Sequence, residues 1–128
     1  MSPLTAKQTF PKAAHVRSRL DFVRVYEQGQ RQSDHLLLIS ARRTGNRLTR
    51  LGLTVSKRAG NSVQRNVWKR LIREAFRLSR SELPSGLDLV VQPRAGAEPE
   101  LNAVRRSLLS LAKRLDKKLP HETPSDPS

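Results

Sequence analysis

The sequence predicts an α+β fold in which helices cover a small mixed sheet. Apolar residues recur three and four positions apart in the segments expected to be helical, whereas they alternate or run together in shorter segments, as in strands. These segments follow one another in the order helix, strand, strand, helix, strand, helix, which favours helices packed on one face of the sheet. The chain has 128 residues, the size of a single domain.

The first helix is expected over residues 19–28. Ser18 followed by Asp21 is a capping-box pattern, and Gly29 is a residue type at which helices end. Apolar residues that share one side of this segment are predicted to face the core: Val16, Leu20 and Val23.

Three strands are expected, over residues 36–41, 49–56 and 87–92. The first is continuously apolar, as a buried strand is. The second and third alternate, so one side packs on the core and the other is open to a ligand. The second strand is expected to point Leu51, Leu53 and Val55 inward. Its open side is expected to carry Arg50, Gly52, Thr54 and Ser56.

Two longer helices complete the predicted domain. The central one is expected over residues 62–79, with Asn61 or Ser62 as its cap. The last is expected over residues 98–117, with an apolar stripe toward the core formed by Leu101, Val104, Leu108, Leu111 and Leu115.

The folded unit is expected over residues 15–118. Residues 1–14 are largely polar and contain Pro3 and Pro11, so they are predicted to be a flexible arm. Residues 119–128 contain three prolines and no periodic apolar residues, so they are predicted to be a disordered tail.

The charge of the chain points to a polyanionic partner. Lys and Arg number 25 against 11 acids, a formal charge of +14. An anionic membrane is disfavoured, because no apolar run approaches the roughly 20 residues needed to span a bilayer. The N-terminus has no apolar segment of the signal-peptide type, and the chain has no Cys, so we expect a cytoplasmic protein without thiolate metal sites.

The central helix concentrates this charge on one side. At 100° per residue one half of the helix is apolar and the other almost purely basic, with like charges four positions apart. Phe76 falls just inside the basic half, and the apolar half consists of Val63, Val67, Trp68, Leu71, Ile72, Ala75 and Leu78. Residues 42–80 hold twelve Lys and Arg and one acid, Glu74. A solvated surface is the ordinary explanation of a charged helix face, but such faces usually mix signs. A single-sign stripe instead indicates phosphate contact.

The residues predicted to contact nucleic acid lie on this side of the helix and just before it. Arginine can grip two phosphate oxygens at once, whereas lysine acts as a point charge. Asn66 lies among these cations and can donate and accept, although an ordinary surface role explains it equally well. The set is Lys57, Arg58, Asn61, Arg65, Asn66, Lys69, Arg70, Arg73 and Arg77.

Phe22 and Tyr26 are candidates for stacking on unpaired bases. They lie four positions apart and off the predicted core side of the first helix. Aromatic faces can stack on bases of any identity. From the residues alone, an ordinary core position is an equally good interpretation. Trp68, in contrast, lies in the apolar half of the central helix and is predicted to be core.

A protein-based active site is not predicted. The histidines His15, His35 and His121 are scattered and are not spaced as metal ligands. The acids are scattered as well, and Gly60 stands alone rather than in a phosphate-cradling loop. We therefore predict no catalytic and no metal-binding residues in the protein.

The stretch from residue 55 to residue 80 resembles the RNR signature of the bacterial ribonuclease P protein family. The resemblance rests on Ser56-Lys57-Arg58, Gly60-Asn61, Val63, Arg65-Asn66, Lys69-Arg70 and Arg73-Glu74-Ala75-Phe76-Arg77. It extends to the spaced aromatics before Gly29 and to the order and length of the elements. The sequence departs from the family pattern at three positions. Val67 stands where the family often has a basic residue, Arg58 stands in place of a usual lysine, and Ser40 stands in place of an aromatic on the first strand.

This resemblance implies more than the residues show. It implies a left-handed crossover through the central helix, and an RNR helix that faces the catalytic RNA of ribonuclease P. It also implies a cleft for the 5′ leader of precursor tRNA, formed by Phe22, Tyr26, Leu38, Thr54 and Arg58. Cleavage would belong to the RNA, with Mg²⁺ needed by the RNA-containing holoenzyme and no cofactor bound by the protein alone. No obligate protein partner is expected.

Two other classes remain open from the sequence. A structural RNA-binding protein of the ribosomal type would share the charge, but it gives no reason for the RNR spacing together with the spaced aromatics. A DNA-binding repressor would need a further helix directly before the recognition helix, where this sequence has a strand pattern.

Overall fold

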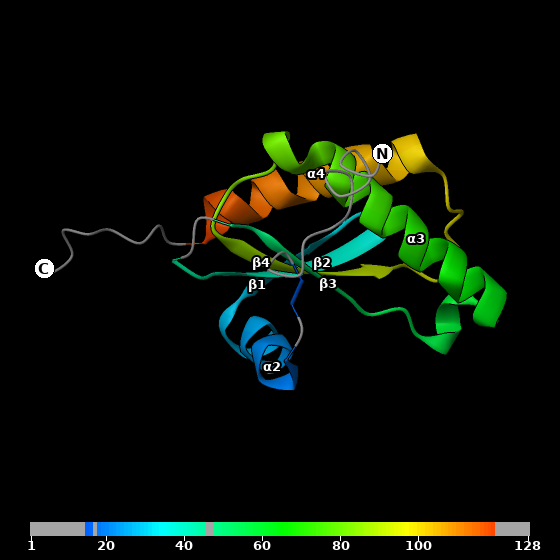
Figure 1. Ribbon diagram of the computed structural model, residues 1–128, viewed down its shortest axis with the longest axis horizontal. Helices are drawn as coiled ribbons and strands as arrows, with labels where there is room; N and C mark the ends of the chain where they lie inside the picture. Colours follow the sequence, from blue (N-terminus) through cyan, green and yellow to red (C-terminus); the bar gives the residue numbers. More distant parts are fainter. Residues whose placement is uncertain (1–14, 17, 46–47, 120–128) are drawn as a thin grey trace, which may run out of the picture.

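The computed structural model describes residues 15–16, 18–45 and 48–119. A four-stranded sheet forms the middle layer. Helices α3 (Ser62–Ser79) and α4 (Leu101–Lys118) lie on one face of this sheet, and α2 (Arg19–Gln28) lies on the other (Figure 1). The predicted α+β class is confirmed, but the helices cover both faces rather than one.

The sheet has the strand order β1-β2-β4-β3 and mixes both pairing directions. β1 (Gln30–Ser33) pairs antiparallel with β2 (Leu37–Arg43), and β2 pairs antiparallel with β4 (Leu87–Pro93). β3 (Arg50–Leu53) pairs in parallel with β4. β1 was not predicted, because its four polar residues form a strand only through their pairing with β2.

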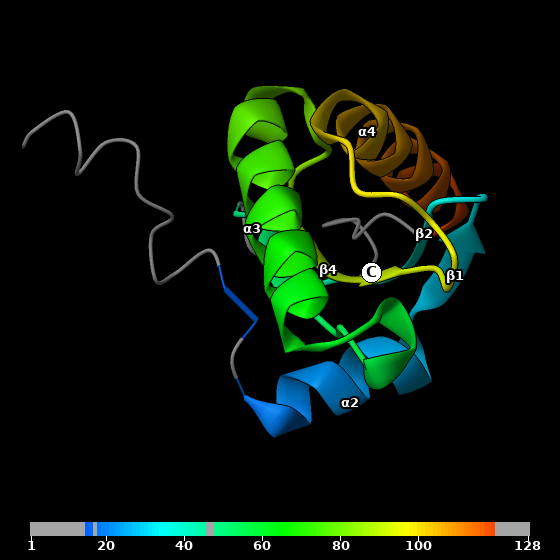
Figure 2. The same ribbon diagram turned by 90° about the vertical axis from the view of Figure 1, so that its right-hand side faces the viewer.

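The connection from β3 through α3 to β4 is left-handed. Figure 2 shows α3 above the sheet, with β1, β2 and β4 following one another from right to left, so the strand order places β3 to the left of β4. Both parallel strands run toward the viewer, and the chain therefore passes from β3 through α3 rightward to β4. Parallel strands are nearly always joined by right-handed connections, so periodicity alone could not have predicted this geometry.

The core lies between the sheet and the pair α3 and α4. Alternate residues of β4 point into it, as predicted for that strand. The predicted stripe of α4 is confirmed at its last four positions, which are fully buried: Val104, Leu108, Leu111 and Leu115.

The predicted core side of α2 is wrong. Leu20 is 56% exposed and Val23 is 38% exposed, whereas Val25 is fully buried. Val16 is buried, but it lies before the helix in an extended segment, where its N–H donates to Leu51 O at 2.9 Å. Val16 is not part of the helix, so its position does not indicate which side of α2 is buried. The side predicted from Val16, Leu20 and Val23 is therefore not the side that packs on the sheet, which carries Val25.

Asp34 ties the connection between β1 and β2 to the last helix. Its carboxylate accepts hydrogen bonds from the backbone N–H groups of Leu36 and Leu37, at 2.8 and 2.9 Å, and from the hydroxyl of Ser107. Burial by itself raises the pKa of Asp34, but these hydrogen bonds outweigh it and leave the pKa below its usual value.

The predicted C-terminal tail begins one residue too early. Leu119 is buried in the core and its N–H donates to Leu115 O at 2.9 Å, so it still belongs to the folded unit. The predicted arm, residues 1–14, and the rest of the predicted tail, residues 120–128, lie outside the described residues.

Candidate RNA-binding surfaces

The central helix α3 starts from a reciprocal cap. The side-chain oxygen of Asn61 accepts the N–H of Gln64 at 2.9 Å, and Gln64 Oε1 accepts the N–H of Asn61 at 2.8 Å. Gly60 precedes the cap with φ at +124°, and a Cβ there would lie 2.0 Å from Gln64 Oε1. Asn61 was predicted to contact RNA, and its side-chain oxygen is engaged in the cap.

The cations of α3 form a continuous basic face. We use this name for Arg65, Lys69, Arg70, Arg73 and Arg77. Arg70 and Arg73 are exposed, as is the interleaved Asn66, whereas Arg65 and Lys69 are half-buried. The helix therefore presents its predicted phosphate contacts together on one side.

The buried side of α3 differs from the predicted apolar half. Trp68, Ile72 and Ala75 are buried as expected, but Val63 is 71% exposed and Val67 is 44% exposed. Phe76, placed by sequence at the edge of the basic half, is only 1% exposed. When apolar residues cover half of a helix, the sequence alone does not show which part of that half is buried. The packing of α3 against the sheet and α4 determines which residues are covered.

Arg77 differs from the other members of the basic face. Its guanidinium makes two hydrogen bonds to Glu74, at 3.1 and 2.6 Å. The hydrogen bond raises the pKa of Arg77 and lowers the pKa of Glu74. Within the described residues no other cation of the basic face has an ion-pair partner. Four of the five cations are thus ready to meet phosphate without first breaking an ion pair.

A second candidate surface forms where α2 lies along β3. The side chain of Phe22 packs over Gly52, since a Cβ at Gly52 would lie 2.9 Å from Phe22 Cζ. One helical turn later, the hydroxyl of Tyr26 is hydrogen-bonded to that of Thr54 at 2.9 Å. Tyr26 remains 49% exposed, whereas Phe22 is partly covered. Phe22 therefore contributes to packing as well as to the predicted cleft.

At the C-terminal end of β4 lies a pocket of about 270 Å³. It brings together two residues of the predicted cleft, Leu38 and Arg58. The remaining lining was missed by the sequence analysis: Ser56, Gln92, Pro93, Arg94 and Ala95. Gln92 could have been found, because it alternates with the inward residues of the third predicted strand.

Lys57 and Arg58 join the two surfaces. They lie in a short 3₁₀ turn, Lys57–Ala59, between β3 and α3, and both are exposed. The hydroxyl of Ser56 accepts the N–H of Arg58 at 3.3 Å, which starts the turn. Along the chain, these two cations therefore lie between β3, which Thr54 directly follows, and the helix that carries the basic face.

A buried ion pair holds α2 in its place over the sheet. Arg50 Nε and Nη2 donate to the two carboxylate oxygens of Asp88 at 2.7 and 2.6 Å, and Nη2 also reaches Asp21 of α2 at 3.3 Å. Asp88 has no solvent exposure, and its hydrogen bond raises the pKa of Arg50 against the opposing effect of burial. The sequence analysis missed this pair because it joins residues 38 positions apart.

Other kinds of site find no support in the described part of the chain. No three acidic or histidine side chains come together there in a way that could hold a metal ion. Among the same residues, no helix is both long and apolar enough to cross a membrane.

Comparison with known proteins decides the family. The family model described as Ribonuclease P matches residues 10–116, which includes α2, the whole sheet, α3 and most of α4. The chain belongs to the ribonuclease P protein family. The alternative of a ribosomal-type protein receives no support from these comparisons.

Relatives in the ribonuclease P family match over most of their length. The ribonuclease P protein component of Thermotoga petrophila is 32% identical over 114 residues, covering 85% of this chain and 97% of that protein. That of Brevibacillus brevis is 39% identical over 105 residues, covering 80% of this chain and 83% of that protein.

Solved structures of the family share the fold. The ribonuclease P protein from Thermotoga maritima superposes with a TM-score of 0.72 at 32% identity, covering 78% of this chain and 96% of that one. The protein from Staphylococcus aureus superposes with a TM-score of 0.71 at 30% identity, covering 80% and 95%. The mixed sheet and its three helices are therefore those of the ribonuclease P proteins.

The three departures from the family pattern fall at different places. Arg58 lines the pocket at the C-terminal end of β4, where it can still hold a phosphate. Val67 lies exposed beside the basic face, so one expected charge is missing there. Ser40 is buried within the sheet at 3% exposure, on the side that carries Leu38.

Proposed function

We propose that this ribonuclease P protein binds the catalytic RNA of the enzyme through the basic face of α3. The observation that carries the proposal is the single-sign charge of that face, on which only Arg77 has an ion-pair partner within the described residues. A chain with a charge of +14 gains most from a partner that supplies many phosphates at once, because each contact releases condensed counterions. Arg70 and Arg73 are exposed and can reach such phosphates without any change in the fold.

The cleft beside α2 is proposed to hold the 5′ leader of precursor tRNA. A single strand needs an apolar or aromatic surface for its bases and cations for its backbone. Tyr26 and Leu38 offer the first, and Arg58 and Arg94 offer the second. Because stacking tolerates every base, such a cleft suits leaders of different sequence.

The protein is proposed to assist cleavage rather than to perform it. Leader removal would be carried out by the catalytic RNA, and Mg²⁺ bound to that RNA would supply the metal chemistry of the holoenzyme. The protein would bind substrate and reduce the repulsion between two polyanions. It would act in the cytoplasm, without an obligate protein partner.

Reconstitution tests this function. The purified chain, mixed with a bacterial ribonuclease P RNA at low Mg²⁺ concentration, is expected to restore cleavage of precursor tRNA at the 5′ end, and the chain alone is expected to be inactive. Robust cleavage by the RNA-free protein, or no gain on adding it to the RNA, would contradict the proposal.

Two matched pairs of variants separate the surfaces. Arg73→Ala should weaken binding of the catalytic RNA and lower the salt dependence by about one counterion, whereas Arg106→Ala, on the exposed side of α4, should do neither. Tyr26→Ala should weaken binding of leader-bearing precursor tRNA to the holoenzyme and leave mature tRNA unaffected. Its control is Leu20→Ala, on the outer side of α2.

A further inference from the structure

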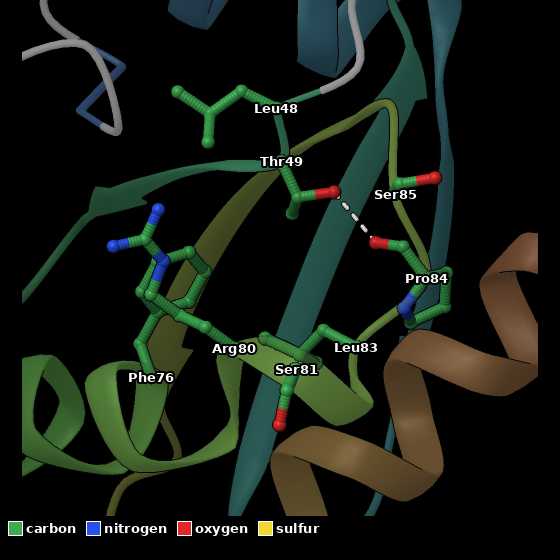
Figure 3. Close-up of a pocket in the computed structure, with 8 residues that line it drawn as sticks. All are labelled: Leu48, Thr49, Phe76, Arg80, Ser81, Leu83, Pro84 and Ser85. Carbon is green, nitrogen blue, oxygen red and sulfur yellow. Dashed lines mark hydrogen bonds between the residues drawn. The ribbon is translucent and has the colours of Figure 1, made fainter.

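A pocket lies at the opposite end of α3 from the capping box. It has a volume of about 380 Å³ and forms where the end of α3, the turn after it and the start of β3 meet (Figure 3). Its lining consists of Leu48, Thr49, Phe76, Arg80, Ser81, Leu83, Pro84 and Ser85. None of these residues belongs to the two surfaces described above.

The walls of this pocket are held in place by hydrogen bonds. The hydroxyl of Thr49 donates to Pro84 O at 2.6 Å and accepts the N–H of Leu87 at 3.2 Å (Figure 3). These bonds tie the start of β3 to the segment that leads into β4. The pocket is therefore preformed, as ligand sites usually are.

The lining is mostly apolar, with polar groups near its edge. Leu48, Leu83 and Pro84 supply aliphatic surface, while the hydroxyls of Ser81 and Ser85 belong to exposed residues. An apolar pocket with a few hydroxyls and one cation fits a flat, partly polar ring better than it fits an ion.

Arg80 connects the pocket to the basic face. It directly follows α3 in a helical conformation, so at 100° per residue its side chain falls between those of Lys69 and Arg73 around the helix axis. Within the described residues its guanidinium has no ion-pair or hydrogen-bond partner. A strand whose phosphates follow the basic face toward the C-terminal end of α3 would thus reach Arg80 at the mouth of the pocket.

We propose that this pocket receives an unpaired nucleobase of an RNA strand bound along the basic face. Arg80 would hold the adjoining phosphate, and Leu48, Leu83 and Pro84 would contact the base. The inference rests on the proposed function, because it requires that RNA lie on the basic face. The base can come from the catalytic RNA or from precursor tRNA.

Photocrosslinking in the holoenzyme tests the assignment and identifies the source of the base. Either the catalytic RNA or the precursor tRNA is transcribed with 4-thiouridine, and in a second pair with 6-thioguanosine, before irradiation of the assembled complex. Crosslinks within residues 80–85 are expected with one of the two RNAs. Arg80→Ala should reduce their yield.

Filling the pocket provides the energetic test. Ser85→Trp is expected to weaken binding of the crosslinked RNA by about 5- to 150-fold, the range for loss of one stacked base. Ser110→Trp, at an exposed position of α4, is the matched control and should bind as wild type. The melting temperature of each variant shows whether it has folded, and Arg80→Ala repeats the test without adding bulk.

The outcomes separate this inference from the proposed function. Normal RNA affinity for Ser85→Trp and Arg80→Ala, with no crosslink in residues 80–85, would overturn the pocket assignment and leave the proposed function standing. Failure of the wild-type chain to bind either RNA would overturn both.

Discussion

Arg50→Met should destabilise the fold far more than its position near the surface indicates. The substitution keeps most of the aliphatic stem but leaves the carboxylate of Asp88 without its cation. That carboxylate has no solvent exposure and loses both of its hydrogen bonds from Arg50, of 2.7 and 2.6 Å. Breaking a buried ion pair by removing one partner costs about 3–5 kcal/mol, because the other charge stays buried and unpaired.

This cost is large against the total stability of a small domain, which is about 5–15 kcal/mol. Urea unfolding can measure it, with the fluorescence of the single tryptophan, Trp68, as the signal, since that residue is buried in α3. With a urea dependence of about 2 kcal/mol per M, a loss of about 4 kcal/mol lowers the midpoint by about 2 M.

Two further variants identify the cause of this loss. Arg24→Met removes one of the two cations paired with Asp21, at 3.4 Å on the surface, and it should cost less than about 1 kcal/mol. Asp88→Asn added to Arg50→Met removes the unpaired charge and should restore a large part of the lost stability. The reasoning is refuted if Arg50→Met unfolds within 1 kcal/mol of wild type, or if the double variant is no more stable than the single one.

Four other substitutions test the core packing, the cap of α3 and the carboxylate of Asp34. Leu108→Ala should lower the free energy of unfolding by about 2–5 kcal/mol, and Leu71→Ala by clearly less, because Leu71 is only half-buried; equal losses in urea unfolding would contradict the assigned core. Gly60→Ala should lower the free energy of unfolding by about 1–2 kcal/mol, because alanine is strained at the positive φ of this position. Any loss of the capping box would add to this cost, and thermal unfolding followed by circular dichroism measures the total. Asp34, whose pKa is lowered in the fold by Ser107 and backbone N–H groups despite burial, contributes stability above about pH 4 that disappears as pH falls through its folded pKa. The stability advantage of wild type over Asp34→Asn should therefore shrink below pH 4 in acid unfolding.

The local pattern of the sequence determined most of the helical part of this protein. The bounds of α3 and α2 and the buried stripe of α4 follow from caps and from a 3.6-residue period, which depend on neighbouring residues alone. The basic face follows in the same way, because side chains on one helix keep their angular relation in any fold. These features were therefore predictable without knowledge of what the helices pack against.

Contacts between distant segments decided the rest. β1 exists only because β2 pairs with it, and α2 turns Leu20 to solvent because Val16 leaves the helix to pair beside Leu51. The buried flank of α3, from Trp68 to Phe76, is selected by the sheet and α4.

The candidate sites show the same division between local and distant causes. The sequence by itself determined which cations of α3 stand on one face. The tertiary structure brought Leu38 next to Arg58 and placed Tyr26 on Thr54. It also paired Arg50 with Asp88 beneath α2. The physical reason is that helix faces are fixed by backbone geometry within a few residues, whereas a cleft requires closure of long loops, whose partners no local pattern specifies.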